Sequence, residues 1–345
     1  MFSEVGNYNM VKLQFKNLYF EVTHSCNQHC LHCFLDSSPQ IDIYEMDTEK
    51  CLKVISNYKE PGGQSIFFTG GEPFVRKDIL ELLIHADGLG LKFSVSSNGI
   101  LLSDNLIKKI SKLKNFQYFF TSILAPDEES HNQMTQNRLS YKRLIKNLHV
   151  FNDIDQYVYI QSTLPRTRFD QMDNIMKTIL SIHNNVTVKF TPIAHIGVKN
   201  VTESNNLIVF PEHFHEFIEI FDKIKEKFGD KVDYPNLTTW DNINDFHQKL
   251  KDTHLYGYDS SCLVVKPNED MTLEITNCKN WTFGKAYKSC EIDINDHLYS
   301  FINAMRKMND EMLHKFKGHR FIDPESYMEK ELPQIYNNYI QTINR

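Results

Sequence analysis

The chain lacks the features that mark membrane, secreted and nucleic-acid-binding proteins. Its formal net charge is −6 over 345 residues, with no block of like charges. No segment reaches the roughly 18 apolar residues of a membrane-spanning helix. Met1–Asn7 has neither the basic nor the apolar region of a signal peptide. The sequence therefore argues against nucleic-acid and membrane partners and predicts a cytoplasmic protein.

Cysteine is also scarce, and its distribution argues against a disulfide framework. There are seven cysteines, an odd number, and they gather in two regions, at 26–33 and 262–290, apart from Cys51. This grouping indicates metal ligation in a reducing compartment. Cys51 lies beside Leu52 and Val54 in a helical pattern, so we expect a buried structural thiol there.

The first group is a C-x3-C-x2-C triplet formed by Cys26, Cys30 and Cys33, directly after a predicted strand. Iron–sulfur cubes are usually held by four thiolates, so three on one short loop would leave one iron open. A structural zinc site is the alternative, with one neighbouring histidine completing a tetrahedron. The candidate histidines are His24, His29 and His32.

A Gly-Gly-Glu-Pro turn, Gly70–Pro73, ends the next apolar run, Ser65–Phe68. Paired glycines let backbone N–H and C=O groups come close to a ligand, and Glu72 adds a carboxylate. A zinc loop needs none of these features. The turn therefore favours the iron–sulfur interpretation over zinc.

Strand and helix patterns alternate up to about residue 195. The strands are expected at 11–22, 65–68, 92–97, 117–123, 157–164 and 187–192, and the helices at 48–58, 76–86, 104–113, 141–151 and 171–183. Six βα units predict an α/β fold, a partial (β/α)6 TIM-like barrel that is open on one side. Both motifs and the Ser96–Gly99 turn then lie at carboxyl ends of strands, where such barrels build active sites.

The alternation stops near residue 209, which suggests three parts. We expect the barrel core at 11–210, a helix from 211 to 228 followed by a polar connector to 260, and a small extension with terminal helices at 261–345. Pro267–Asp270 lies between two apolar runs and predicts a β-hairpin. The hairpin would bring Cys278 back toward Cys262.

In their order and spacing, these motifs resemble those of radical S-adenosylmethionine (SAM) enzymes with a C-terminal SPASM or twitch extension, over about residues 15–290. The resemblance implies that Cys26, Cys30 and Cys33 hold a [4Fe–4S] cluster whose open iron binds SAM. It also implies that the Gly70–Pro73 turn, with Glu72, contacts the SAM amino group. Further implied SAM contacts are Gly70, Gly71, Pro73, Ser96, Asn98, Ser122, Gln161, Ser162, Pro192 and Ile193.

The local sequence bears on four of these positions. Leu124 and Ala125 replace the family's Asp-Gly after Ser122. Asn98 precedes Gly99, so it is equally a turn-forming residue. Gln161 and Ser162 are consecutive in a strand, so only one of them should face inward.

The second cysteine group falls in the extension. By the resemblance, Cys262, Cys278 and Cys290 are too few for two auxiliary clusters, and we expect one auxiliary iron–sulfur cluster there. The alternatives are a zinc site and a cysteine that donates a hydrogen atom to a substrate radical.

The resemblance implies an enzyme that reductively cleaves SAM to a 5′-deoxyadenosyl radical and abstracts hydrogen from a substrate. The SPASM-like extension points to a peptide or protein, as in crosslinking or side-chain oxidation of a ribosomally made peptide. A flavodoxin- or ferredoxin-type electron donor is expected. The alternatives are a small-molecule metabolite, peptide epimerisation with a cysteine donor, and a metal-bound scaffold or sensor without turnover.

Overall fold

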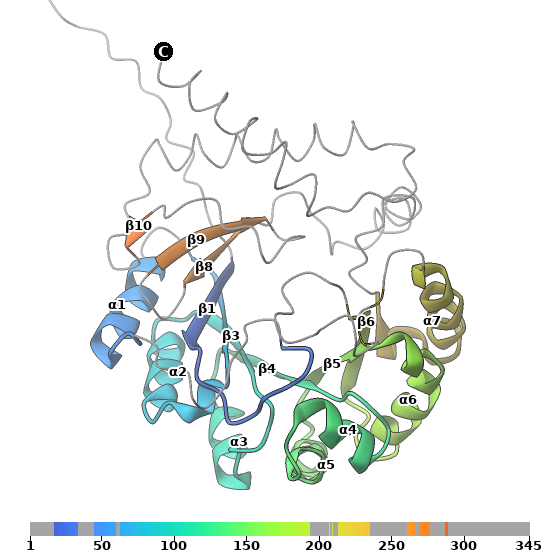
Figure 1. Ribbon diagram of the computed structural model, residues 1–345. Helices are drawn as coiled ribbons and strands as arrows, with labels where there is room; N and C mark the ends of the chain where they lie inside the picture. The colour runs from blue at the N-terminus through green and yellow to red at the C-terminus, as the bar shows by residue number, and fades with distance from the viewer. Residues whose placement is uncertain are drawn as a thin grey trace, which may run out of the picture.

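The computed structural model describes residues 17–33, 45–59, 63–193, 207, 209, 213–234, 261–265, 270–275 and 287–288. Strands and helices alternate along most of this length (Figure 1). The strands are β1 Asn17–Thr23, β2 Ser65–Gly70, β3 Lys92–Ser96, β4 Phe116–Ser122, β5 Val158–Leu164, β6 Val186–Pro192, β7 Val232–Asp233, β8 Ser261–Val265, β9 Asp270–Ile275 and β10 Tyr287–Lys288. The helices are α1 Thr48–Lys59, α2 Ile79–Gly88, α3 Asp104–Ile110, α4 Glu128–Thr135, α5 Ser140–Asp153, α6 Met172–Leu180 and α7 Phe214–Phe228, with 3-10 turns at Pro73–Val75, Arg166–Gln171 and Gly229–Lys231.

The strands form one sheet in the order β10-β9-β8-β1-β2-β3-β4-β5-β6-β7. Strands β1 to β7 are parallel to their neighbours. Figure 1 shows the sheet curving like part of a barrel, with α1, α2, α3, α5, α6 and α7 on its convex side. The predicted partial (β/α)6 barrel is confirmed, and every βα loop opens at the carboxyl ends of the strands.

The predicted hairpin is also confirmed, and it belongs to the same sheet. β8 and β9 pair antiparallel, with Cys262 opposite Glu274 and Val265 opposite Met271. β8 then pairs parallel with β1, where Cys262 lies opposite Asn17. This pairing was not predicted, because the sequence of a strand does not indicate which strand lies beside it.

Two further elements differ from the expectation. β7 forms within the segment described as a polar connector and pairs with β6 through Val188 and Val232. α4 was not predicted, although Asp127 accepts a hydrogen bond from Ser130 N at 2.9 Å and caps it. An N-cap aspartate followed by two glutamates is a helix-start signal, so the sequence contained the evidence for α4.

Strand periodicity separates the two faces of the sheet. Along β5, Val158, Ile160 and Leu164 are buried in the core beneath the helices, whereas Tyr159 and Gln161 lie on the opposite, concave face. Aromatic rings pack across the concave face from β1 to β5 through Tyr19, Phe67, Phe120 and Tyr159. Aromatic rings therefore cover much of the concave face, and its polar side chains lie toward the carboxyl ends of the strands.

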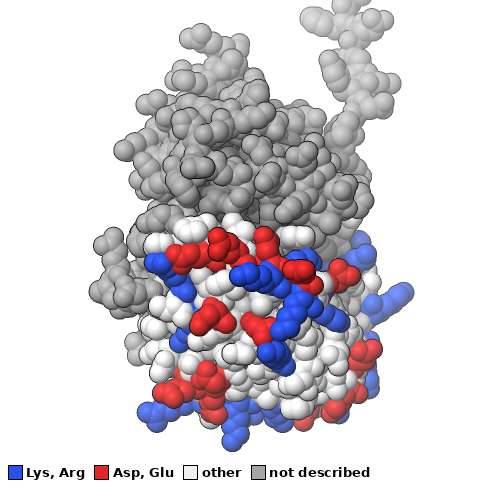
Figure 2. All heavy atoms as spheres, turned by 90° about the vertical axis from the view of Figure 1, so that its right-hand side faces the viewer, with Lys and Arg blue, Asp and Glu red and all other residues white. Residues whose placement is uncertain are grey.

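The outer surface over α6 and α7 carries both signs of charge. Figure 2 shows acidic and basic side chains intermingled on this side of the molecule. Asp173 pairs with Lys177 and Lys227, and Arg166 pairs with Glu216. Within the described residues, no helix is long and apolar enough to cross a membrane.

Candidate active site

The three cysteines of the first group lie on the loop that follows β1. A turn places Cys33 N at 3.0 Å from Cys30 O, and Gln28 N donates to Cys26 Sγ at 3.4 Å. Burial raises the pKa of the Cys26 thiol to about 11, and it raises the pKa of the Cys30 thiol further, with added repulsion from the other two cysteines. Such thiols are poor nucleophiles, and a bound metal is what would deprotonate them.

The chemistry of this loop fits an iron–sulfur cluster. Three soft sulfur ligands are grouped on one turn, and a backbone N–H already points at one of them. The neighbouring histidines are placed differently: His24 Nε2 bonds Glu21 Oε2 at 2.9 Å, and His29 is exposed. Among the residues that the structure describes, no three Cys, His, Asp or Glu side chains converge as the ligands of a single ion would. In a cube, each thiolate binds a different iron.

The Gly-Gly-Glu-Pro turn is bonded directly to the cysteine loop. Gly71 N donates to Thr23 O at 2.7 Å, and Glu72 N donates to Ser25 O at 2.9 Å. Gly70 has φ +124°, and a Cβ on Gly71 would lie 2.3 Å from Ser25 O. The sequence suggested that the glycines let the backbone come close to a ligand. In the structure, the backbone of this turn lies close to the cysteine loop.

Glu72 is fully buried, and both of its carboxylate oxygens have protein partners. Oε1 accepts from Phe74 N at 3.1 Å and Ser97 Oγ at 3.0 Å, and Oε2 accepts from Asn98 N at 2.7 Å. Burial raises the pKa of this carboxyl to about 7, and these three hydrogen bonds oppose the rise. In this structure Glu72 anchors the turn that follows β3.

Asn98 combines the two roles that the sequence left open. Its Oδ1 accepts from Ile100 N at 3.0 Å, which forms the expected turn. Its Nδ2 donates to Asn27 Oδ1 at 2.6 Å and lies 3.8 Å from Cys26 Sγ. The turn after β3 therefore contacts the cysteine loop, and Glu72 holds both.

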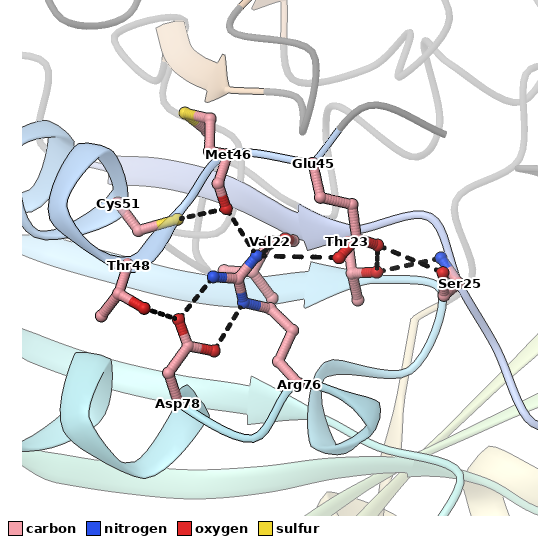
Figure 3. A network of polar contacts seen from close by, with 9 residues as sticks. All are labelled: Val22, Thr23, Ser25, Glu45, Met46, Thr48, Cys51, Arg76 and Asp78. Atoms are coloured by element: carbon pink, nitrogen blue, oxygen red, sulfur yellow. Dashed lines mark hydrogen bonds and ion pairs between the residues drawn. The ribbon is translucent and has the colours of Figure 1, made fainter. Parts of the chain in front are cut away.

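Arg76 ties the two ends of the cysteine loop together from below (Figure 3). Its Nη1 donates to Val22 O at 3.1 Å, before the loop, and to Met46 O at 2.9 Å, after it. Asp78 holds the guanidinium through bonds of 2.9 and 2.5 Å. Cys51 is buried beside this network, with its Sγ 3.8 Å from Met46 O, as expected of a structural thiol.

The other side of the cysteine loop rests on α4 and α5. Leu31 N donates to Met134 O at 2.9 Å, and Asn137 Nδ2 donates to Asn27 O at 3.2 Å. The buried Gln28 reaches α5 through its side chain. These contacts were not predicted, because α4 was not predicted. Together with the Gly-Gly-Glu-Pro turn and Arg76, they support the cysteine loop from both sides.

The remaining predicted SAM contacts divide by the face on which they lie. Ser96 and Ser122 are half-buried at the carboxyl ends of β3 and β4, and the half-buried Gln161, in the middle of β5, lies opposite Ser122. Ser162 is fully buried and donates to Ile123 O, so Gln161 is the inward member of that pair. Pro192 and Ile193 are buried at the end of β6, where Ile193 packs with Leu124 and Met134.

Two buried polar atoms at the site have no protein partner in the described part of the chain: Nδ1 of His32, in the cysteine loop, and Oγ1 of Thr191, at the end of β6. Burying an unpaired polar atom is costly, so both positions suit the polar atoms of a bound group. His32 lies in the loop expected to hold the cluster, and Thr191 precedes the predicted SAM contacts Pro192 and Ile193. The site therefore fits SAM as well as the cluster.

Of the second cysteine group, only the backbone of Cys262 is described, in β8. Cys278 and Cys290 lie outside the described residues. One auxiliary iron–sulfur cluster in this region stays a prediction.

Residues 20–179 match the family model described as the Radical SAM superfamily. Residues 20–179 are a radical SAM domain. The matched segment contains the three cysteines, the Gly-Gly-Glu-Pro turn and the Asn98 turn. Enzymes of this family use a [4Fe–4S] cluster together with SAM, which agrees with the donor set described above.

Individual relatives extend this finding. An AdoMet-dependent heme synthase from Oleidesulfovibrio alaskensis is 28% identical over 158 residues, covering 46% of this chain and 40% of its own. The match thus spans less than half the length of that relative. Streptococcus suis SuiB bound to precursor peptide SuiA has a TM-score of 0.62 at 15% identity, covering 90% and 68% of the two chains. The enzyme anSMEcpe, with bound AdoMet and a Cp18Cys peptide, also has a TM-score of 0.62, at 17% identity and with coverage of 94% and 99%.

Proposed function

We propose that this chain is a radical SAM enzyme that abstracts a hydrogen atom from a peptide or protein substrate. The observation that carries the proposal is the group of three half-buried thiols on one loop, at the carboxyl edge of the sheet of a radical SAM domain. When reduced cluster and SAM are bound, they supply a 5′-deoxyadenosyl radical. The protein residues then have to hold the ligands and the substrate in place.

Several residues of this chain are suited to that task. Gly71, Glu72 and Arg76 fix the cysteine loop from one side, and α4 supports it from the other. Asn98, Ser122 and Gln161 present polar groups at the same edge and are proposed to orient SAM. A rigid loop and pre-placed polar groups keep the reacting atoms close, which accounts for much of an enzyme's rate acceleration.

A peptide substrate is supported by the fold. The likeness to SuiB and anSMEcpe extends over at least 90% of this chain, beyond the radical SAM domain, and both structures contain peptides. The sheet is open, with β7 and β10 at its two edges. A metabolite substrate is the second candidate, because curated relatives of the radical SAM domain include heme synthases. A flavodoxin- or ferredoxin-type protein is proposed as the electron donor.

The activity is tested with anaerobically reconstituted full-length protein, SAM and dithionite. We expect 5′-deoxyadenosine and methionine from the wild type and none from the variant in which Cys26, Cys30 and Cys33 are replaced by alanine. Cys51→Ala is the matched control, since Cys51 belongs to α1 and not to the triplet, and it should retain activity. Formation of 5′-deoxyadenosine by the triple variant would refute the assignment of the cluster.

The substrate class is tested by hydrogen transfer from a perdeuterated extract of the source organism, split by ultrafiltration. A peptide or protein substrate predicts deuterium in 5′-deoxyadenosine with the large fraction and none after that fraction is digested with protease. Deuterium transferred from the small, protease-resistant fraction would favour a metabolite instead.

A further inference from the structure

A chain of buried side chains connects the cysteine loop to the end of β4. Cys30 Sγ lies 3.3 Å from Gln28 Oε1, and Gln28 Nε2 lies 2.7 Å from Ser140 Oγ at the start of α5. Ser140 Oγ lies 2.9 Å from His131 Nε2, and His131 Nδ1 accepts from Leu124 N at 3.2 Å. Gln28, Ser140 and His131 are at most 5% exposed, so water does not compete for these bonds.

The backbone N–H of Leu124, at one end of this chain of contacts, decides which group donates and which accepts in each hydrogen bond. Leu124 N–H can only donate, so neutral His131 carries its proton on Nε2 and donates to Ser140 Oγ. The Ser140 hydroxyl can then donate onward to the Gln28 amide oxygen. That leaves the Gln28 NH₂ group facing Cys30. A half-turn of the Gln28 amide exchanges its oxygen and nitrogen, and the surrounding hydrogen bonds decide which of the two orientations is adopted.

Whether Cys30 is a free thiol or a metal ligand selects between the two orientations of the Gln28 amide. A free thiol can donate to the Gln28 oxygen, which is the arrangement in this structure. A sulfur bound to iron has no proton and can only accept. With the half-turned amide, each of the four contacts from Leu124 N–H to the Cys30 sulfur joins one donor to one acceptor.

We propose that, in the loaded enzyme, Gln28 Nε2 donates a hydrogen bond to the cluster-bound sulfur of Cys30, and that Ser140 and His131 orient the amide for this purpose. The inference rests on the proposed cluster at Cys26, Cys30 and Cys33. Hydrogen bonds to cluster sulfurs stabilise the more negative, reduced state and so raise the reduction potential. Gln28 thereby makes the cluster easier to reduce.

The test is an EPR-monitored redox titration of the SAM-free cluster in full-length protein. Gln28→Leu keeps the side-chain size and removes the donor, so the midpoint should become more negative at unchanged iron content. Ser140→Ala should shift it in the same direction by a smaller amount, and the double variant should match Gln28→Leu alone, because both act through one bond. Gln133→Leu, at an exposed glutamine on α4, is the matched control and should leave the midpoint unchanged.

A second measurement is made on the wild type, so it does not depend on whether a variant still binds the cluster. Glutamine labelled with ¹⁵N at Nε2 should produce a ¹⁵N hyperfine coupling to the reduced cluster in pulsed EPR spectra of the wild type. Absence of that coupling, or an unchanged midpoint in iron-loaded Gln28→Leu, would overturn the proposal. Neither result affects the proposed function, which is tested separately by iron binding at the triplet, SAM cleavage and hydrogen transfer from the substrate.

Discussion

Replacing Glu72 by glutamine should remove a pH-dependent loss of stability that the wild type suffers. The carboxyl is 0% exposed, and burial raises its pKa from 4.5 to about 7. A carboxyl whose folded-state pKa is raised favours the protonated form in the folded chain. Its stabilising contribution is therefore present below pH 4.5 and is lost as the pH rises to about 7. The rise corresponds to about 3 kcal/mol, at 1.36 kcal/mol per pKa unit.

Glutamine does not titrate, so Glu72→Gln isolates this effect. It also turns one acceptor oxygen into a donor toward Phe74 N, Ser97 Oγ or Asn98 N, at a cost of about 1–3 kcal/mol. That cost is constant with pH and cancels when the two proteins are compared across the range. The variant's free energy of unfolding, minus that of the wild type, should thus rise by about 3 kcal/mol between pH 4.5 and 8.

The assay is urea denaturation at a series of pH values. Both proteins should carry alanine at the three loop cysteines, so that cluster binding does not contribute to stability. Ser103→Ala, which removes the exposed cap of α3, is a suitable control, because it should lower stability equally at every pH. A flat difference for Glu72→Gln across the range would refute the reasoning that burial dominates the pKa of Glu72.

Three further outcomes are expected. Gly71→Ala should prevent the turn from closing on the cysteine loop, since the added Cβ would lie 2.3 Å from a backbone oxygen. Gly88→Ala is the control: it has open space around it and should stabilise α2 by about 0.5–1 kcal/mol. Equal shifts in the melting temperatures of the two variants would contradict this. Arg76→Met removes the partner of a buried ion pair and both carbonyl contacts, so urea denaturation should show a loss on the order of 3 kcal/mol, against little change for the exposed Lys77→Met. The variant without the loop cysteines should retain about four irons if one auxiliary [4Fe–4S] cluster exists, and near zero would reject that cluster. Its proposed ligands are Cys262, Cys278 and Cys290.

The sequence by itself determined the architecture and the location of the chemistry. Alternating strand and helix patterns predicted the open barrel, because each pattern depends on local periodicity and burial. The cysteine triplet and the Gly-Gly-Glu-Pro turn were placed at neighbouring strand ends, because parallel strands share one carboxyl edge. The hairpin at β8 and β9 followed from turn chemistry between two apolar runs.

Only the tertiary structure decided which groups these residues contact. Gly71 and Glu72 were predicted to contact SAM, and the structure adds that their backbone N–H groups bind the cysteine loop. Gln28 and Ser140 are 112 positions apart, and their contact exists because α4 and α5 dock on that loop. Strand pairing and helix docking bring together segments that are distant in the sequence, and a local sequence pattern does not indicate which segment it will pack against. The chemistry of the site was therefore readable from residue types, whereas the hydrogen bonds that orient it required the fold.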